Sequence, residues 1–209
     1  MVRQRVRLRF TKQGDLRWIG HRDLARLMER LFRRAGLRLG MSQGYHPKPR
    51  MSFPSALALG MEGLDEVIEL ELAEPWTAAA LMDRLGAHAI AGLTFRSAES
   101  LPPGASKARV RSVTYEVPLA GQPIPAVARR AAELMATPSL PVRRARGGAE
   151  VDLRHSLEAL EVHGSTLRMR LAASRRAAAG PREVLIALGL QQLLETGAVI
   201  VRTRVELEP

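Results

Sequence analysis

Cysteine is absent from this chain of 209 residues. The absence excludes disulfide bonds, thiol catalysis, zinc sites built on thiolates and any iron–sulfur cluster held by this chain. Long apolar runs are absent as well, since no stretch approaches the roughly 18 apolar residues of a membrane span. The N-terminal stretch MVRQRVRLRF alternates charged and apolar side chains, where a signal peptide needs an unbroken apolar run. We therefore expect a cytoplasmic protein with no membrane partner.

Motifs for metal binding and catalysis are also scarce. His88, His155 and His163 lack the spacing of metal ligands, and no carboxylate pair stands out. The sequence contains neither a glycine-rich phosphate loop nor a serine nucleophile motif. We expect no cofactor to be bound by this chain.

Basic residues are concentrated at the start of the chain. Residues 1–50 hold 14 Lys and Arg against 3 Asp and Glu, whereas residues 51–209 hold 18 of each kind. The net charge of +11 therefore belongs to the first quarter. Only three of the 32 basic residues are lysine, so an Arg-rich genome explains the choice of residue but not the clustering. Such a block favours a polyanionic partner, because Arg and Lys bind phosphates and release their counterions.

The first half of the chain predicts a β-α-β-β-α-β order. Residues 3–10 alternate strictly, which places Arg3, Arg5, Arg7 and Arg9 on one face of a strand. Residues 21–35 have apolar side chains at helical spacing, and Gly36 is a typical helix-terminating residue. The remaining predicted elements are strands at 52–60 and 65–74, a helix at 77–89 and a strand at 92–99.

The second half repeats this order after LPPGAS at 101–106, the best candidate linker. Its predicted elements are strands at 109–120, 141–145, 157–162, 165–172 and 198–208, with helices at 126–136 and 181–195. We predict an α+β protein of two tandem ferredoxin-like halves. The proposed domains are 1–103, the basic N-terminal domain, and 107–209, the C-terminal domain.

The segment GDLRWIGHRDLARLMERLFRRAGLRLGMSQGYHPKPRMSFPSALALGMEG carries the most specific motifs. These are a Gly-Asp-Leu-Arg turn at 14–17, a His-x-Asp-Leu helix start at 21–24, an Arg-Arg-Ala-Gly helix end at 33–36 and a Ser-Gln-Gly-aromatic-x-Pro-x-Pro loop at 42–49. With these motifs the sequence resembles the radical-SAM-linked protein family. Its members are bacterial proteins of unknown function, found alone or fused C-terminal to cobalamin-binding radical S-adenosylmethionine proteins. Gly20 departs from the pattern, because a serine usually precedes the histidine.

The resemblance implies an association with a radical SAM protein, in some cases a cobalamin-binding one, and no established activity. This chain is not the radical enzyme, since such an enzyme needs a Cys-x-x-x-Cys-x-x-Cys ligand set and the chain has no cysteine. We therefore expect a non-catalytic accessory protein that binds RNA, such as tRNA or rRNA.

The loop SQGYHPKPRMSF, residues 42–53, is the first candidate binding surface. Tyr45 can stack on a base, His46 can donate to a phosphate, and Lys48 and Arg50 can hold backbone charge. The structural alternative is that Tyr45 and Phe53 pin the loop to the core. The full set of candidate residues for binding RNA or a partner is Arg17, His21, Arg22, Arg33, Arg34, Gln43, Tyr45, His46, Lys48 and Arg50.

Two other functions remain open. His21 and His46 can serve as the acid and base of a metal-independent endoribonuclease. Alternatively, the protein is an adaptor whose basic surface binds an acidic protein and no RNA. The arginines of the first strand also have a structural interpretation, because Glu69 and Glu71 on a neighbouring strand can pair with Arg5, Arg7 or Arg9.

Overall fold

The computed structural model describes residues 4–144, 148, 150–173 and 179–209. Arg3 of the first predicted strand and Ala145 of the strand predicted at 141–145 lie outside the described residues. The chain divides into two compact units, residues 1–109 and residues 110–209. Both units combine helices with an antiparallel sheet, so the predicted α+β class is confirmed.

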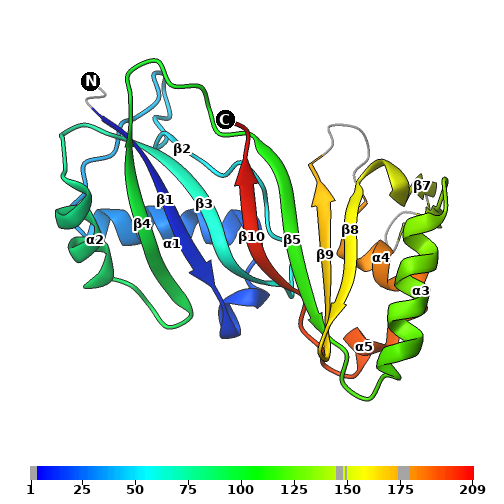
Figure 1. Ribbon diagram of the computed structural model, residues 1–209. Coiled ribbons are helices and arrows are strands. Elements are labelled where there is room, and N and C mark those ends of the chain that lie inside the picture. The colour runs from blue at the N-terminus through cyan, green and yellow to red at the C-terminus, as the bar shows by residue number, and fades with distance from the viewer. Residues whose placement is uncertain (1–3, 145–147, 149, 174–178) are drawn as a thin grey trace. The chain divides into compact units, whose positions relative to one another are not determined.

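The first unit contains a sheet with the strand order β4-β1-β3, and β2 pairs with β3 (Figure 1). All of these pairs are antiparallel. The elements are β1 (Gln4–Lys12), the 3-10 turn η1 (Gly14–Trp18), α1 (His21–Arg34), β2 (Met51–Ser52), β3 (Glu62–Leu72), α2 (Ala78–Gly86) and β4 (Leu93–Leu101).

Both helices of the first unit cover the same face of this sheet. Alternation along β1 directs Val6, Leu8 and Phe10 into the core. The core also contains Leu24, Met28, Leu31 and Phe32 of α1 and Leu81 and Leu85 of α2. The opposite face of β1 therefore carries its arginines.

Gly92, just before β4, accepts a backbone hydrogen bond from the residue that follows β1, and any other residue at this position would be strained. The N–H of Gln13 donates to the carbonyl of Gly92 over 2.8 Å. Gly92 has a φ of +82°, and a Cβ atom there would lie 2.3 Å from the Gln13 carbonyl oxygen. Both the backbone conformation and the space thus require glycine at this position.

The second unit has a sheet with the order β10-β5-β9-β8, again antiparallel, and a separate hairpin of β6 and β7. The strands are β5 (Val110–Pro118), β6 (Pro141–Arg143), β7 (Glu150–Asp152), β8 (Leu157–His163), β9 (Thr166–Ala172) and β10 (Val201–Leu207). The helices are α3 (Ile124–Ala136), the 3-10 turn η2 (Leu153–His155), α4 (Pro181–Leu188) and α5 (Gln192–Glu195).

Two predicted elements differ from the structure. The strand predicted at 52–60 is wrong beyond Ser52, where β2 ends. Pro54 follows closely, and proline has no N–H for a strand ladder. The single helix predicted at 181–195 is also wrong, because Gly189 adopts a left-handed conformation with a φ of +70° and separates α4 from α5.

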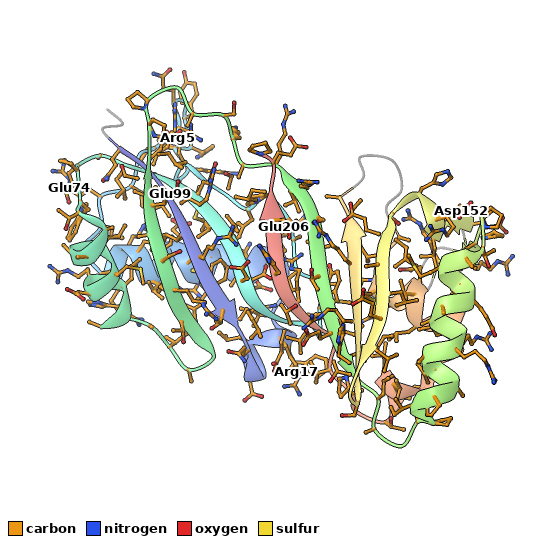
Figure 2. All side chains as sticks on the ribbon, in the orientation of Figure 1. Arg5, Arg17, Glu74, Glu99, Asp152 and Glu206 are labelled. Carbon is orange, nitrogen blue, oxygen red and sulfur yellow. The ribbon has the colours of Figure 1, made fainter. Side chains whose placement is uncertain are left out.

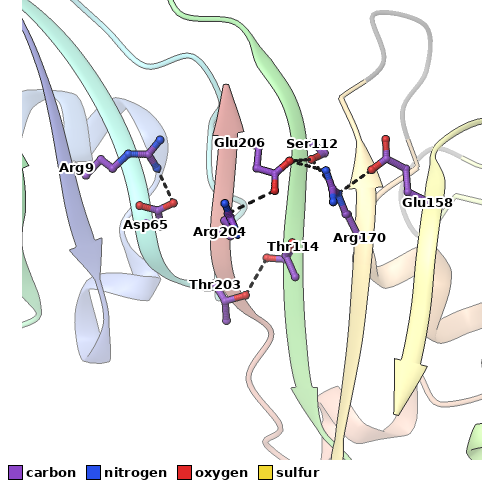
Figure 3. Close-up of polar contacts among 9 residues, drawn as sticks. All are labelled: Arg9, Asp65, Ser112, Thr114, Glu158, Arg170, Thr203, Arg204 and Glu206. Atoms are coloured by element: carbon purple, nitrogen blue, oxygen red, sulfur yellow. Dashed lines mark hydrogen bonds and ion pairs between the residues drawn. The ribbon is translucent and has the colours of Figure 1, made fainter. Parts of the chain in front are cut away.

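A network of charges covers one face of the second sheet (Figure 3). Glu206 of β10 accepts a hydrogen bond of 2.9 Å from the hydroxyl of Ser112, and Arg170 lies 2.5 Å from the same carboxylate. Arg170 also pairs with Glu158 at 2.8 Å. The Ser112 hydrogen bond, with the charges of Arg170 and Arg204, lowers the pKa of Glu206 below its ordinary value.

Candidate functional site

The loop after α1 is a closed structure held by its own backbone. The N–H of Arg50 donates to the carbonyl of Gly40 over 2.8 Å, and the N–H of Ser42 donates to the carbonyl of Lys48 over the same distance. The same two residues share a second hydrogen bond, in which the N–H of Lys48 donates to the hydroxyl of Ser42 over 2.9 Å. Gly40 in turn donates to the carbonyl of Glu71 in β3 over 2.7 Å. We call residues 42–48 the clamped loop.

The tip of the clamped loop projects into solvent. Tyr45 is fully exposed, at 102 % of its reference area, and Gln43, His46 and Lys48 are exposed around it. Gly44 has a φ of +126°, a conformation that other residues avoid. The alternative in which Tyr45 anchors the loop to the core is therefore wrong. Phe53 is the anchoring residue, since its ring lies edge-on to Phe10 of the core with centroids 6.3 Å apart.

A pocket of about 320 Å³ opens at the base of the clamped loop. Arg50, whose side chain is 44 % exposed, lines the pocket and pairs with Glu71 at 3.1 Å. The residues that line the pocket are Arg5, Arg50, Met51, Ser52, Glu69, Leu70, Glu71 and Lys107. Lys107 was missed by the sequence analysis, because it lies beside the predicted linker and far from Arg50 in the chain.

Glu69 is the buried centre of the charges beside this pocket. Its side chain is only 5 % exposed and accepts hydrogen bonds from Arg7, at 2.9 and 3.1 Å, and from Arg5, at 3.3 Å. The N–H of Ala108 adds a further hydrogen bond of 3.3 Å, and Arg5 also donates to the carbonyl of Ala105. The segment around residues 105–108 is therefore attached to the sheet of the first unit.

The arginines of β1 are consequently neutralised, as the structural interpretation of the sequence allowed. Arg9 pairs with Asp65 at 2.5 Å (Figure 3), and Arg7 also approaches the exposed Glu99 at 3.6 Å. Glu71 pairs with Arg50 instead of an arginine of β1. The positive block at residues 1–50 thus loses part of its charge to acidic residues that the fold brings from β3 and β4.

A second group of candidates lies at the start of α1. The guanidinium of Arg17 stacks over the ring of Trp18, 4.9 Å from its centroid, and lies 3.8 Å from the carboxylate of Glu62. His21 packs edge-on against Phe53 with centroids 5.1 Å apart. Arg22 is exposed beside it. Arg17 also appears near the bottom of the view in Figure 2, whereas Arg5 appears near the top.

The basic residues at the end of α1 have partners of their own. Arg33 pairs with Glu29 one turn earlier at 2.6 Å, and Arg34 donates to the carbonyl of His88 over 2.8 Å. The structure therefore places Arg33 and Arg34 against α1 and the segment after α2. Lys48 and Arg50 belong instead to the clamped loop and its pocket. Within the described residues, no hydrogen bond joins His21 to His46.

The described residues contain neither a metal-binding group nor a membrane-spanning helix. No group of three His, Asp or Glu side chains among them could hold a metal ion. In the same part of the chain, no helix has the length and apolar character that crossing a bilayer requires.

The fold and the loop define a mixed α+β protein that presents an aromatic and basic loop to solvent. The chain belongs to the family DUF2344, described as an uncharacterized protein conserved in bacteria, whose model matches residues 5–181. No curated protein matches the chain. Among solved structures, the crystal structure of an unknown protein from Galdieria sulphuraria is 12 % identical, with 99 % of each chain covered and a TM-score of 0.33.

Proposed function

We propose that this protein binds RNA through the clamped loop, and that it does so without acting as a catalyst. The observation that carries the proposal is the complete exposure of Tyr45 on a loop with fixed ends. A tyrosine in this position contributes little to the core, whereas a fixed aromatic ring provides a stacking surface for a base at small entropic cost. Lys48 and Arg50, next to the ring in the chain, supply charge for the phosphates.

We also propose that the protein works beside a radical SAM enzyme and presents the RNA, such as tRNA or rRNA, to it. This part depends on the resemblance of residues 14–63 to radical-SAM-linked proteins. The absence of cysteine supports a separate catalytic partner, because this chain has no ligands for the iron–sulfur cluster. A cross-linked pull-down that recovers such an enzyme together with RNA tests the partnership.

Each unit is proposed to be ferredoxin-like. The strand orders β4-β1-β3-β2 and β10-β5-β9-β8 support this assignment, as does the antiparallel pairing in both units. The extra hairpin of β6 and β7 is an addition to that pattern.

Substitution of Tyr45 by alanine tests RNA binding. The loss of one stacked base, worth ~1–3 kcal/mol, should weaken the binding of single-stranded RNA by roughly five- to a hundred-fold. The melting temperature should stay unchanged, because Tyr45 is fully exposed. Tyr45→Phe is the matched control, since it keeps the aromatic ring that stacks on a base and removes only the hydroxyl group, so its affinity for RNA should stay close to that of the wild type. Equal affinity for Tyr45→Ala and the wild type would contradict the proposal.

The two alternative functions give different results in the same assays. An endoribonuclease that uses His21 and His46 would cleave RNA in the presence of a chelator, whereas the proposed accessory protein leaves the RNA intact. An adaptor for an acidic protein would not bind RNA even at low salt. The packing of His21 against Phe53 favours a structural role for that histidine.

A further inference from the structure

We infer that the pocket lined by Arg5, Arg50 and Lys107 is a phosphate-binding subsite. The inference rests on the proposed function of the clamped loop, because Arg50 belongs both to the pocket and to the base of that loop. It adds a residue, Lys107, that the sequence analysis placed in no site, and it names the chemical group that the pocket takes.

The balance of charge in the pocket favours an anion. Three cationic side chains line it, against the two carboxylates of Glu69 and Glu71. Glu69 is already neutralised by hydrogen bonds from both Arg5 and Arg7. Arg50 uses one guanidinium nitrogen for Glu71, and its other N–H groups are available to donate to an anion. The pocket therefore carries an excess of positive charge that a phosphate would reduce.

The position of Lys107 is fixed by the contacts of its neighbours in the chain. Ala105 accepts a hydrogen bond from Arg5 through its carbonyl, and Ala108 donates one of 3.3 Å to Glu69. Lys107 is held between these two attachments and lines the pocket with an exposed side chain. In the described part of the chain its ammonium group has no hydrogen-bond acceptor or ion-pair partner.

The size and composition of the pocket fit a small polar group. Its volume of about 320 Å³ is at the lower end of ligand sites. Ser52 is also on the lining, and its hydroxyl group is able to donate to a phosphate oxygen. A guanidinium, an ammonium and a hydroxyl group together form a typical phosphate-binding set.

The first test uses inorganic phosphate alone. At constant ionic strength, phosphate should raise the melting temperature of the wild type, and above the dissociation constant the rise should follow the logarithm of the phosphate concentration, as expected for a ligand that binds the folded state. Lys107→Gln should abolish most of this rise in melting temperature, and Arg96→Gln, which removes an exposed charge from β4 of the same unit, should retain it. Identical phosphate curves for the three proteins would overturn the inference.

The second test uses a fluorescein-labelled single-stranded RNA of 12 nucleotides. Lys107→Gln should weaken its binding roughly tenfold. It should also lower the slope of log K against log salt by about 0.7, the value for one phosphate contact on a single strand. Arg96→Gln should change neither quantity.

The two tests separate failure of the subsite from failure of the proposed function. If the wild type binds phosphate through Lys107 but does not bind the RNA, the pocket takes a free phosphate compound and the RNA proposal is wrong. If the RNA binds and Lys107→Gln leaves both the salt slope and the phosphate curve unchanged, the subsite is wrong and the RNA proposal stands.

Discussion

Arg7 of β1 and Glu69 of β3 face each other in the antiparallel register, and the guanidinium donates hydrogen bonds of 2.9 and 3.1 Å to the carboxylate. Glu69 is buried and Arg7 is only partly exposed. A carboxylate in such a place is stable only while its partners remain. This pair, together with Arg5 and Ala108, links the sheet to the segment before residue 109.

Removal of Glu69 should therefore destabilise the protein strongly. Glu69→Ala leaves Arg5 and Arg7 without a buried counter-charge, and we expect the free energy of unfolding to fall by about 3 kcal/mol. Glu99→Ala is the control, since Glu99 contacts the same Arg7 but is 63 % exposed. An exposed ion pair is worth at most about 1 kcal/mol. Urea unfolding measures both variants, and equal losses would contradict the buried role of Glu69.

The arginines at the end of α1 provide a test of how specific the electrostatic attraction is. If the basic N-terminal region guides RNA, Arg33→Glu combined with Arg34→Glu should weaken RNA binding more than a similar change in the second unit. Arg202 is unsuitable for the comparison, because it is 1 % exposed and its replacement would disturb the core.

Arg129 and Arg130 of α3 are a closely matched control. Arg129 pairs with Glu133 one turn away, as Arg33 does with Glu29, and Arg130 donates to a backbone carbonyl, as Arg34 does. The control variant combines Arg129→Glu with Arg130→Glu, and it changes the net charge by the same amount as Arg33→Glu with Arg34→Glu. Titration of RNA at several salt concentrations measures the effect, and equal losses would indicate only nonspecific attraction.

The contribution of Asp152 to the stability of the β6–β7 hairpin should depend on pH. Hydrogen bonds from the N–H groups of Leu140 and Arg154, at 2.8 and 2.9 Å, and from the hydroxyl of Ser139 lower the pKa of Asp152 below its ordinary value. The folded pKa is lower than the unfolded one, so the stabilisation is complete above the unfolded pKa and is lost as the pH falls through the folded pKa.

Asp152→Asn tests this dependence because the amide does not titrate. The difference in melting temperature between the wild type and Asp152→Asn should be constant from pH 7 to 5 and should shrink below about pH 4. A difference that stays constant down to pH 2.5 would rule out the proposed linkage.

Local patterns in the sequence predicted most of the helices and strands. Alternation identified β1, and helical spacing identified α1, because each pattern reports directly on one buried face. Gly189 shows why boundaries are harder to predict: a glycine within a helical pattern can continue the helix or end it, and the choice depends on the packing of both segments. The apolar residues after Pro54 predicted a strand to residue 60, but β2 ends at Ser52, close to a proline that has no N–H for the ladder.

The candidate site was predicted in part. The loop was recognised from its mixture of aromatic, basic and rigid residues, and the structure confirms that Tyr45 and Lys48 are exposed. Lys107 was missed because its relation to Arg50 depends on the fold. The pairing of Arg7 with Glu69 was anticipated from the predicted neighbouring strand, whereas the pairing of Arg9 with Asp65 was not.

The exposure of Tyr45 also makes the clamped loop a convenient point for chemical labelling. The chain has two tyrosines, and the other, Tyr115, is buried. Mild nitration should therefore modify Tyr45 selectively. Because the chain has no cysteine, Tyr45→Cys would create a single thiol on which a maleimide dye or a spin label reports the approach of any partner to the loop.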